Sequence, residues 1–244
     1  MTNLDRLESV ITNDRPIRMV EDNIYSLIPE ATTAKQYDNK AGLYDSIVGT
    51  FLYNRVMWGD SPAAYRAFAR LAIESDPDGY ILDAGCGSML FTAAAHAACG
   101  RLVIACDQSM DMLRRARKRL IDVSGSMPEN VILLQADLSD LPFRGHGFQT
   151  ILCMNVLHHY SDAKALVTKF RSLLNHGGHL YMTSLVSNNR FVGDQYLNVL
   201  YKKRWIVTPT SYESLSGLLG DVLGSDLKLS ITGNMAYITA APTC

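Results

Sequence analysis

Two glycines in the string LDAGCGS (residues 82–88) could bring the backbone close to a ligand. Glycine has no Cβ, so alternate glycines let the chain turn tightly where a helix begins and its N–H groups can bind. Such a pair also occurs in strand-to-helix turns that bind nothing. Asp107 makes the glycine pair more informative. This residue ends the next apolar run, 20 residues after Gly87, where a carboxylate can accept both hydroxyls of a ribose. The spacing indicates a nucleoside site, although Asp107 could instead cap a helix starting near Ser109.

Two further carboxylates bear on which nucleoside would fit. Asp137 ends the third apolar run, where an acidic side chain could read an adenine amino group. Asp83 lies two residues before the first glycine, where its charge would repel a pyrophosphate and attract a ligand with an ammonium and a sulfonium group. Dinucleotide-binding turns usually carry a third glycine at the position of Leu90. These residues favour a sulfonium nucleoside over a dinucleotide.

Short apolar runs alternate with helix-length segments through the middle of the chain. The runs are YILDAG (80–85), RLVIACD (101–107), VILLQAD (131–137), TILCMNVL (150–157) and HLYMTSLV (179–186), and the helices are expected at Leu90–Ala98, Met110–Asp122 and Asp162–Leu174. This alternation predicts a parallel sheet with helices on both faces. Two alternating runs joined by Gly233-Asn234 predict a C-terminal antiparallel hairpin. Residues 1–75 show helical patterning and no clear strand, so they are expected to form an all-helical cap.

Composition points to an ordinary globular protein acting on a small partner. The chain has 244 residues, 48% of them apolar, and a net charge of −1, which gives no electrostatic signature for nucleic acid or an anionic membrane. It has no run of 18 consecutive apolar residues and no apolar signal segment at its start, so we expect a cytoplasmic protein without a membrane span. The five cysteines are odd in number and lack metal-site spacing, so reduced thiols and no metal are expected.

An ordered set of motifs resembles the class I S-adenosylmethionine-dependent methyltransferases, particularly the small-molecule group around the ubiquinone and menaquinone C-methyltransferases. The resemblance spans roughly residues 37–180 and includes LDAGCG (82–87), DQSMDML (107–113), AD (136–137) leading to LPF (141–143), Phe148, VLHH (156–159) and LLNHGGHL (173–180). The chain departs from the family at Met89, where a third glycine is common, and at Gln149, where an acidic residue is common. Neither departure removes a side chain on which the nucleoside contacts depend.

The resemblance implies a Rossmann-like, doubly wound sheet of seven strands that binds S-adenosylmethionine and releases S-adenosylhomocysteine. Its cofactor contacts would fall on Tyr37, Asp83, Gly85, Cys86, Gly87, Asp107, Gln108, Met112, Ala136, Asp137, Leu138, Met154 and Asn155. Tyr37 and Tyr44 correspond to tyrosines that close over the cofactor in similar members, with Tyr44 expected to act on turnover, although their spacing also suits one buried helix face. The expected division is a cap (1–75), a cofactor-binding core (76–183), an acceptor-side insert (184–212) and a closing helix with hairpin (213–244).

His158 and His159 follow the fourth predicted strand and are candidates for a general base, although either could simply pack in the core. The insert carries aromatic side chains, so we expect a small, hydrophobic or aromatic acceptor. Tyr160 and Lys164 have the spacing found in short-chain dehydrogenases, which leaves a nicotinamide-dependent oxidoreductase as an alternative. A cofactor-binding partner protein without activity is the second alternative. The basic run at 114–119 is expected to be a solvated helix face.

Overall fold

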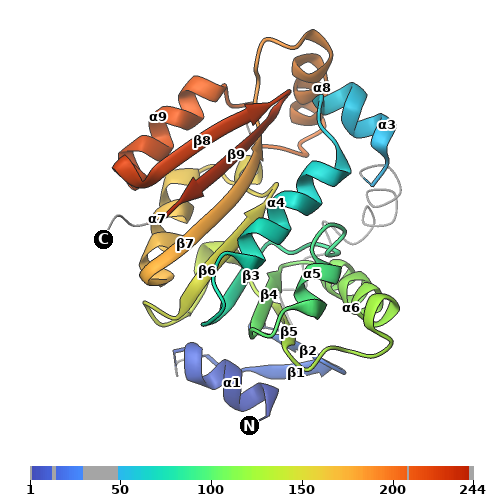
Figure 1. Cartoon of the computed structure of the whole chain (residues 1–244), viewed down its shortest axis with the longest axis vertical. Helices are drawn as coiled ribbons and strands as arrows, with labels where there is room; N and C mark the ends of the chain where they lie inside the picture. Colours follow the sequence, from blue (N-terminus) through green and yellow to red (C-terminus); the bar gives the residue numbers. More distant parts are fainter. Residues whose placement is uncertain (1, 13–14, 30–48, 208, 242–244) are drawn as a thin grey trace.

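A computed structural model describes residues 2–12, 15–29, 49–207 and 209–241. These residues form one mixed sheet of nine strands in the order β1-β2-β5-β4-β3-β6-β7-β9-β8 (Figure 1). Its parallel centre consists of β3 (Ile81–Ala84), β4 (Val103–Asp107), β5 (Val131–Gln135), β6 (Phe148–Met154) and β7 (Leu174–Leu185). The sheet therefore has the alternating, doubly wound architecture that the apolar runs predict.

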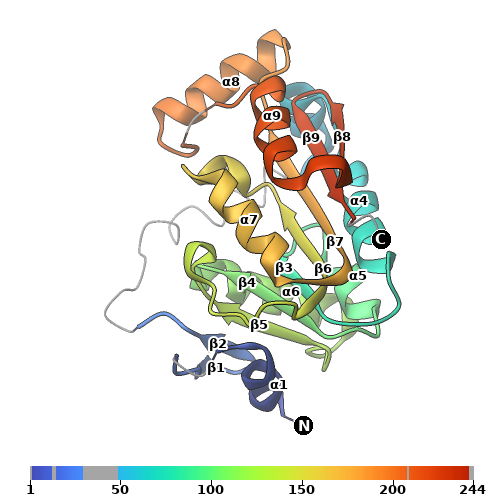
Figure 2. The ribbon, with the colours of Figure 1, turned by 90° about the vertical axis from the view of Figure 1, so that its left-hand side faces the viewer.

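Helices cover both faces of this sheet (Figures 1 and 2). On one face lie α4 (Pro62–Glu74), α5 (Ala93–Ala98) and α6 (Met110–Ser124), which bury side chains against Ile81 and Val103. On the other face lie α1 (Asn3–Val10), α7 (Ala163–Leu173) and α9 (Tyr212–Leu223), which pack against Leu82 and Ile104. Adjacent residues of one strand thus pack against helices on opposite faces of the sheet, as the two-residue period of a strand requires.

The C-terminal hairpin is confirmed. Strands β8 (Leu227–Thr232) and β9 (Met235–Ala240) pair antiparallel, and β9 also pairs antiparallel with β7. Gly233 in the turn has φ +60°, and a Cβ there would lie 1.9 Å from the carbonyl oxygen of Trp58. Glycine is therefore required in this turn both by its backbone conformation and by its contact with the N-terminal half of the chain.

The prediction of a seven-stranded sheet with an all-helical cap is wrong in its details. Residues before position 30 contribute β1 (Arg18–Glu21) and β2 (Ile24–Ser26), and β2 pairs parallel with β5. These strands have four and three residues, too few to show a two-residue alternation, and their turn contains Asn23 at φ +61°. Asparagine tolerates this left-handed conformation, so the turn carries no glycine signal.

The end of the molecule near α8 is built from aromatic side chains. The segments α3 (Phe51–Tyr53) and η2 (Asn54–Trp58) lie beside α8 (Phe191–Lys202), and Trp58, Tyr65 and Leu197 share one buried cluster there. None of the helices in the described ranges has the length and apolar character that a bilayer-crossing segment requires.

Candidate active site at the carboxyl ends of the parallel strands

The glycine-rich turn leaves β3 and is fixed against β4. The amides of Gly85 and Cys86 both donate to the carbonyl oxygen of Cys106, at 2.8 and 2.9 Å. Gly85 has φ +75° and Gly87 φ +51°, and Met89 also takes a positive φ of 54°. The turn continues through Met89, so α5 begins at Ala93 and not at the predicted Leu90.

The two glycines have different surroundings. A Cβ on Gly85 would lie 2.4 Å from Cγ2 of Val156, so the absence of a side chain is required for packing. A Cβ on Gly87 would meet nothing within 4 Å. Gly87 therefore borders open space, which is what a backbone that approaches a ligand requires.

Asp107 at the end of β4 is held against this turn. Its Oδ2 accepts a hydrogen bond from the Gly87 amide and its Oδ1 accepts one from the Ser109 amide, both at 2.9 Å. Burial raises the pKa of Asp107 from 3.8 to about 6, although the two amides oppose this shift. The cap of α6 is Ser109, whose hydroxyl accepts from the Met112 amide, so the carboxylate of Asp107 joins the turn to the helix start without being the N-cap.

Asp83 lies beneath the turn and forms a buried pair with a residue that no motif of the sequence indicates. It is 1% exposed, and its Oδ2 lies 2.8 Å from Nε2 of His96, which is also fully buried. Burial alone would lower the pKa of His96, but the hydrogen bond and charge of Asp83 outweigh it and raise the pKa to about 9. The negative charge of Asp83 is thus shared with a cation behind the turn. A lone histidine in the helix AAAHAA was the available signal.

The residues after β5 form a short turn beside Asp107. Asp137 accepts a hydrogen bond from the Ser139 amide at 2.8 Å and caps the short helix η3 (Leu138–Asp140). Ala136 and Leu138 are buried, and the Gln108 carbonyl accepts from the Gln135 side chain at 3.1 Å. These contacts bring the predicted residues of β4 and β5 together at one edge of the sheet. Met112 lies in the first turn of α6, partly buried.

The end of β6 contributes Met154 and Asn155. Asn155 has φ +58°, and its amide and side-chain oxygen both bond to the hydroxyl of Thr183 on β7. Met154 is partly buried and packs against the aromatic cluster. The strand end is therefore fixed by β7 before the chain enters η4 (Leu157–His159).

The two histidines of η4 have different surroundings, although their rings lie 4.3 Å apart. The Nδ1 of His158 accepts a weak hydrogen bond from the Leu185 amide at 3.4 Å, and burial places the pKa of His158 well below its usual value. Burial also lowers the pKa of His159, with a hydrogen bond to the Trp205 backbone opposing the shift. His158 packs in the fold, whereas His159 faces a cavity.

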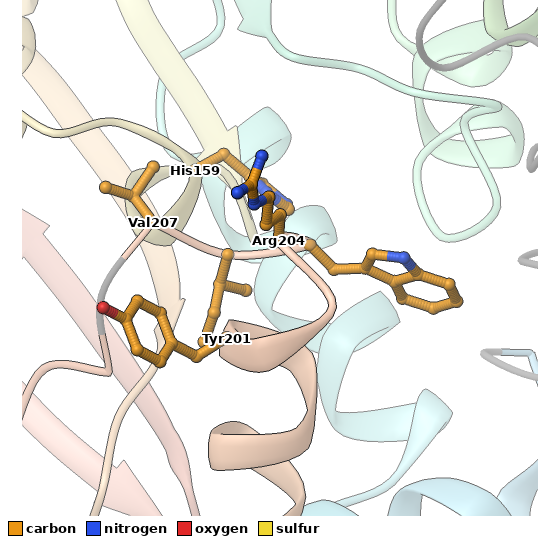
Figure 3. A pocket seen from close by; sticks show the side chains of 6 residues that line it. His159, Tyr201, Arg204 and Val207 are labelled. Carbon is orange, nitrogen blue, oxygen red and sulfur yellow. The ribbon is translucent and has the colours of Figure 1, made fainter.

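This cavity has a volume of about 220 Å³ and lies between η4 and the segment after α8 (Figure 3). It is lined by His159, Tyr201, Arg204, Trp205, Ile206 and Val207. Two of the insert's aromatic residues are thus at the cavity. A third, Tyr196, packs instead against Tyr53 and Trp58.

Several other candidates lie away from this edge or outside the described residues. Tyr37 and Tyr44 are among the latter, so their expected closure over the cofactor stays a prediction. Lys164 pairs with Asp221 at 2.9 Å on the surface. Most cations of the basic run bond to the protein itself, as in Arg114 with Glu21, so the expected solvated helix face also ties α6 to β1. Within the described residues, no group of three metal-binding side chains occurs and the four cysteines are free thiols.

Comparison with known proteins places the central sheet in a family. Residues 81–178 match a family model described as a methyltransferase domain. An uncharacterised chloroplastic methyltransferase of Arabidopsis thaliana is 27% identical over 175 residues, covering 66% of this chain and 49% of that protein. A ubiquinone biosynthesis O-methyltransferase of Xanthomonas campestris is 30% identical over 117 residues, covering 48% of this chain and 46% of that protein.

The chain spans about half the length of these curated relatives. A solved structure of magnesium protoporphyrin IX methyltransferase from Synechocystis, with S-adenosylhomocysteine bound, superposes with a TM-score of 0.63 at 19% identity, covering 88% of this chain and all of that one. That likeness shows the shared fold. The matched family model identifies residues 81–178 as a methyltransferase domain.

Proposed function

We propose that this protein transfers the methyl group of S-adenosylmethionine to a small, hydrophobic or aromatic acceptor. One observation carries the proposal: the Asp107 carboxylate is held at the end of β4 by the Gly87 amide, beside open space above that glycine. A carboxylate so placed can accept both ribose hydroxyls, and the backbone of Gly85–Gly87 can follow the ligand without a Cβ in the way.

The residues at this edge fit the cofactor. Asp107 would hold the ribose, and Asp137 with Leu138 would bound the adenine from the neighbouring strand end. Asp83 with its partner His96 would lie beneath the amino-acid portion of the cofactor. When bound, S-adenosylmethionine supplies an electrophilic methyl group on a sulfonium. The protein contributes mainly by orienting the acceptor atom in line with that methyl, which is worth far more than a single contact.

His159 is the described side chain best placed to remove a proton from the acceptor. Its lowered pKa keeps the imidazole neutral at neutral pH, so it can accept a proton. Its Nδ1 is buried and has no hydrogen-bond partner in the part of the chain that the structure describes. The imidazole of His159 would take the proton that the acceptor atom loses as it gains the methyl group.

Cofactor binding tests this proposal directly. S-Adenosylhomocysteine at about 100 times its Kd should add about 2.7 kcal/mol of stability and raise Tm by roughly 5–10 °C. Asp107→Ala should weaken that binding at least about tenfold, because charge-assisted hydrogen bonds to the ribose are lost. Asp122→Ala is the matched control, since Asp122 is an exposed carboxylate at the far end of α6.

Other outcomes would contradict the proposal. Stabilisation by NADH and not by S-adenosylhomocysteine would favour the nicotinamide oxidoreductase. An unchanged Kd in Asp107→Ala, measured by calorimetry, would restrict Asp107 to a structural role. Cofactor binding without methyl transfer to any compound in an acceptor screen would favour the inactive partner protein.

A further inference from the structure

Three consecutive cations lie at the C-terminal end of α8, close in sequence to the residues that line the cavity beside His159. They are Lys202, Lys203 and Arg204, and none of them forms an ion pair with a carboxylate of the described residues. The Lys203 ammonium lies 5.7 Å from the centre of the Trp205 ring, a cation–π distance. On α6, by contrast, Arg114 pairs with Glu21 and Arg117 donates to the Asp22 carbonyl. The cluster after α8 thus has positive charge that no described acidic group offsets.

Of the three cations, Arg204 lines the cavity. Its backbone has φ +57°, an uncommon conformation for a residue with a side chain. The conformation is held from both sides: the Arg204 amide donates to the Tyr201 carbonyl and the Trp205 amide donates to the Leu200 carbonyl, each at 2.9 Å. Figure 3 shows the Arg204 side chain extending from this turn on the same side as the ring of His159. The fold thus maintains a strained turn that places a guanidinium at the cavity.

The remaining lining is mostly apolar or aromatic. Ile206 is 5% exposed, and Trp205, Val207 and Tyr201 complete the wall. A cavity of about 220 Å³ is smaller than the usual drug-sized pocket, so it suits one substituted ring. Arg204 is solvent-exposed beside these walls, where its planar guanidinium can donate two parallel charge-assisted hydrogen bonds to a carboxylate or phosphate.

We propose that the methyl acceptor carries an anionic group, a carboxylate or a phosphate, on an aromatic or apolar body, and that Arg204 binds that group. The inference rests on the proposed function in one respect: it places the acceptor in the cavity that His159 lines. It refines the expectation of a small, hydrophobic or aromatic acceptor, because recognition then depends on charge as well as on the apolar wall. Arg204 is a specificity-determining residue in this arrangement, with His159 at the reacting end.

The experiment compares anions with a neutral molecule of matched shape. The probes are phenylacetate, phenyl phosphate and phenylacetamide, titrated into protein labelled with 5-fluorotryptophan. The chain has two tryptophans, so the fluorine spectrum has two signals, and Trp205→Phe assigns the one at the cavity. We expect at least one anion to shift the Trp205 signal with a Kd about tenfold below that of the amide, as a charge-assisted contact requires.

Variants separate the cavity guanidinium from general positive charge. Arg204→Gln should bring the anion-to-amide ratio close to one, whereas Lys202→Gln, which removes a neighbouring charge that does not line the cavity, should preserve most of it. The two anions distinguish a carboxylate acceptor from a phosphate acceptor. Equal binding of the amide, an unchanged ratio in Arg204→Gln, or no Trp205 shift by either anion at millimolar concentration would overturn the proposal.

The titration is run without cofactor and again with saturating S-adenosylhomocysteine. Failure of S-adenosylhomocysteine to bind would count against the proposed methyl transfer, while the anion preference would still be measured on the free protein. Loss of the anion preference with intact S-adenosylhomocysteine binding would count against this inference alone.

Discussion

Replacing Asp107 by asparagine should distinguish the contribution of this residue to ligand affinity from its effect on the free energy of unfolding. The wild-type carboxylate accepts the Gly87 and Ser109 amides through its two oxygens. Asparagine keeps the shape but offers one oxygen and an NH₂ group, much as a protonated carboxyl offers one oxygen and a hydroxyl. The variant should therefore resemble the protonated wild type at every pH.

The magnitude follows from the pKa. Burial raises the pKa of Asp107 from 3.8 to about 6, which corresponds to about 3 kcal/mol between its two protonation states. The folded pKa lies above the unfolded one, so the folded state holds the proton more tightly and the contribution to stability is lost as pH rises through about 6. The difference in unfolding free energy, variant minus wild type, should be near zero at about pH 4 and should reach about +3 kcal/mol at about pH 7.

Urea denaturation of the ligand-free proteins across that range measures the difference. Asp122→Asn is the control, because an exposed carboxylate should give a flat difference. In parallel, the variant should bind S-adenosylhomocysteine at least about tenfold more weakly, and wild-type affinity should fall as pH drops below about 6. A stability difference that stays constant with pH, or an asparagine variant that is destabilised at neutral pH, would refute the idea that Asp107 is a partly buried carboxylate held for the ligand at a cost in stability.

Gly85→Ala should destabilise the protein by about 2–4 kcal/mol, because the new Cβ meets Val156 and the backbone φ is positive. Gly87→Ala should cost only about 1 kcal/mol, because its Cβ would meet nothing within 4 Å. Equal losses of stability in urea denaturation would contradict the packing role assigned to Gly85. His159→Ala should lower the rate of transfer of a labelled methyl group by roughly 10²–10⁴ when the acceptor must lose a proton. Burial lowers the pKa of His159, so the wild-type rate should remain unchanged as pH is lowered through about 6.5, the usual pKa of histidine. A rate that falls by half at that pH would argue against His159 as the base.

The central sheet could be predicted from the sequence because its strands are buried on both faces and so form continuous apolar runs. The same runs placed Gly85, Asp107 and Asp137 at neighbouring strand ends. Helix α6 ends within two residues of its predicted position, since Ser109 and Gly125 provide local signals at its two ends.

What the sequence did not show depends on partners distant along the chain. The sequence shows Asp83 only as an acidic residue of a motif, because its partner His96 lies 13 positions later and the fold brings the two together. The guanidinium of Arg204 reaches the cavity through a left-handed turn that no glycine marks. Tyr196 and Trp205 are both aromatic residues of the same insert, yet Tyr196 packs against the buried cluster and Trp205 lines the cavity.

The hairpin of β1 and β2 also determines how this sheet can associate with other chains. Without it, β5 would be an outer strand with a row of unpaired backbone groups and the apolar side chains of VILLQ, which is a template for edge-to-edge aggregation. The hairpin replaces that edge with a strand of four residues that begins with Arg18, ends with Glu21 and has an irregular register between Met19 and Glu21. Short length, charge and a break in register all discourage further strand addition. The residues before the methyltransferase core thus act as a cover for its aggregation-prone side.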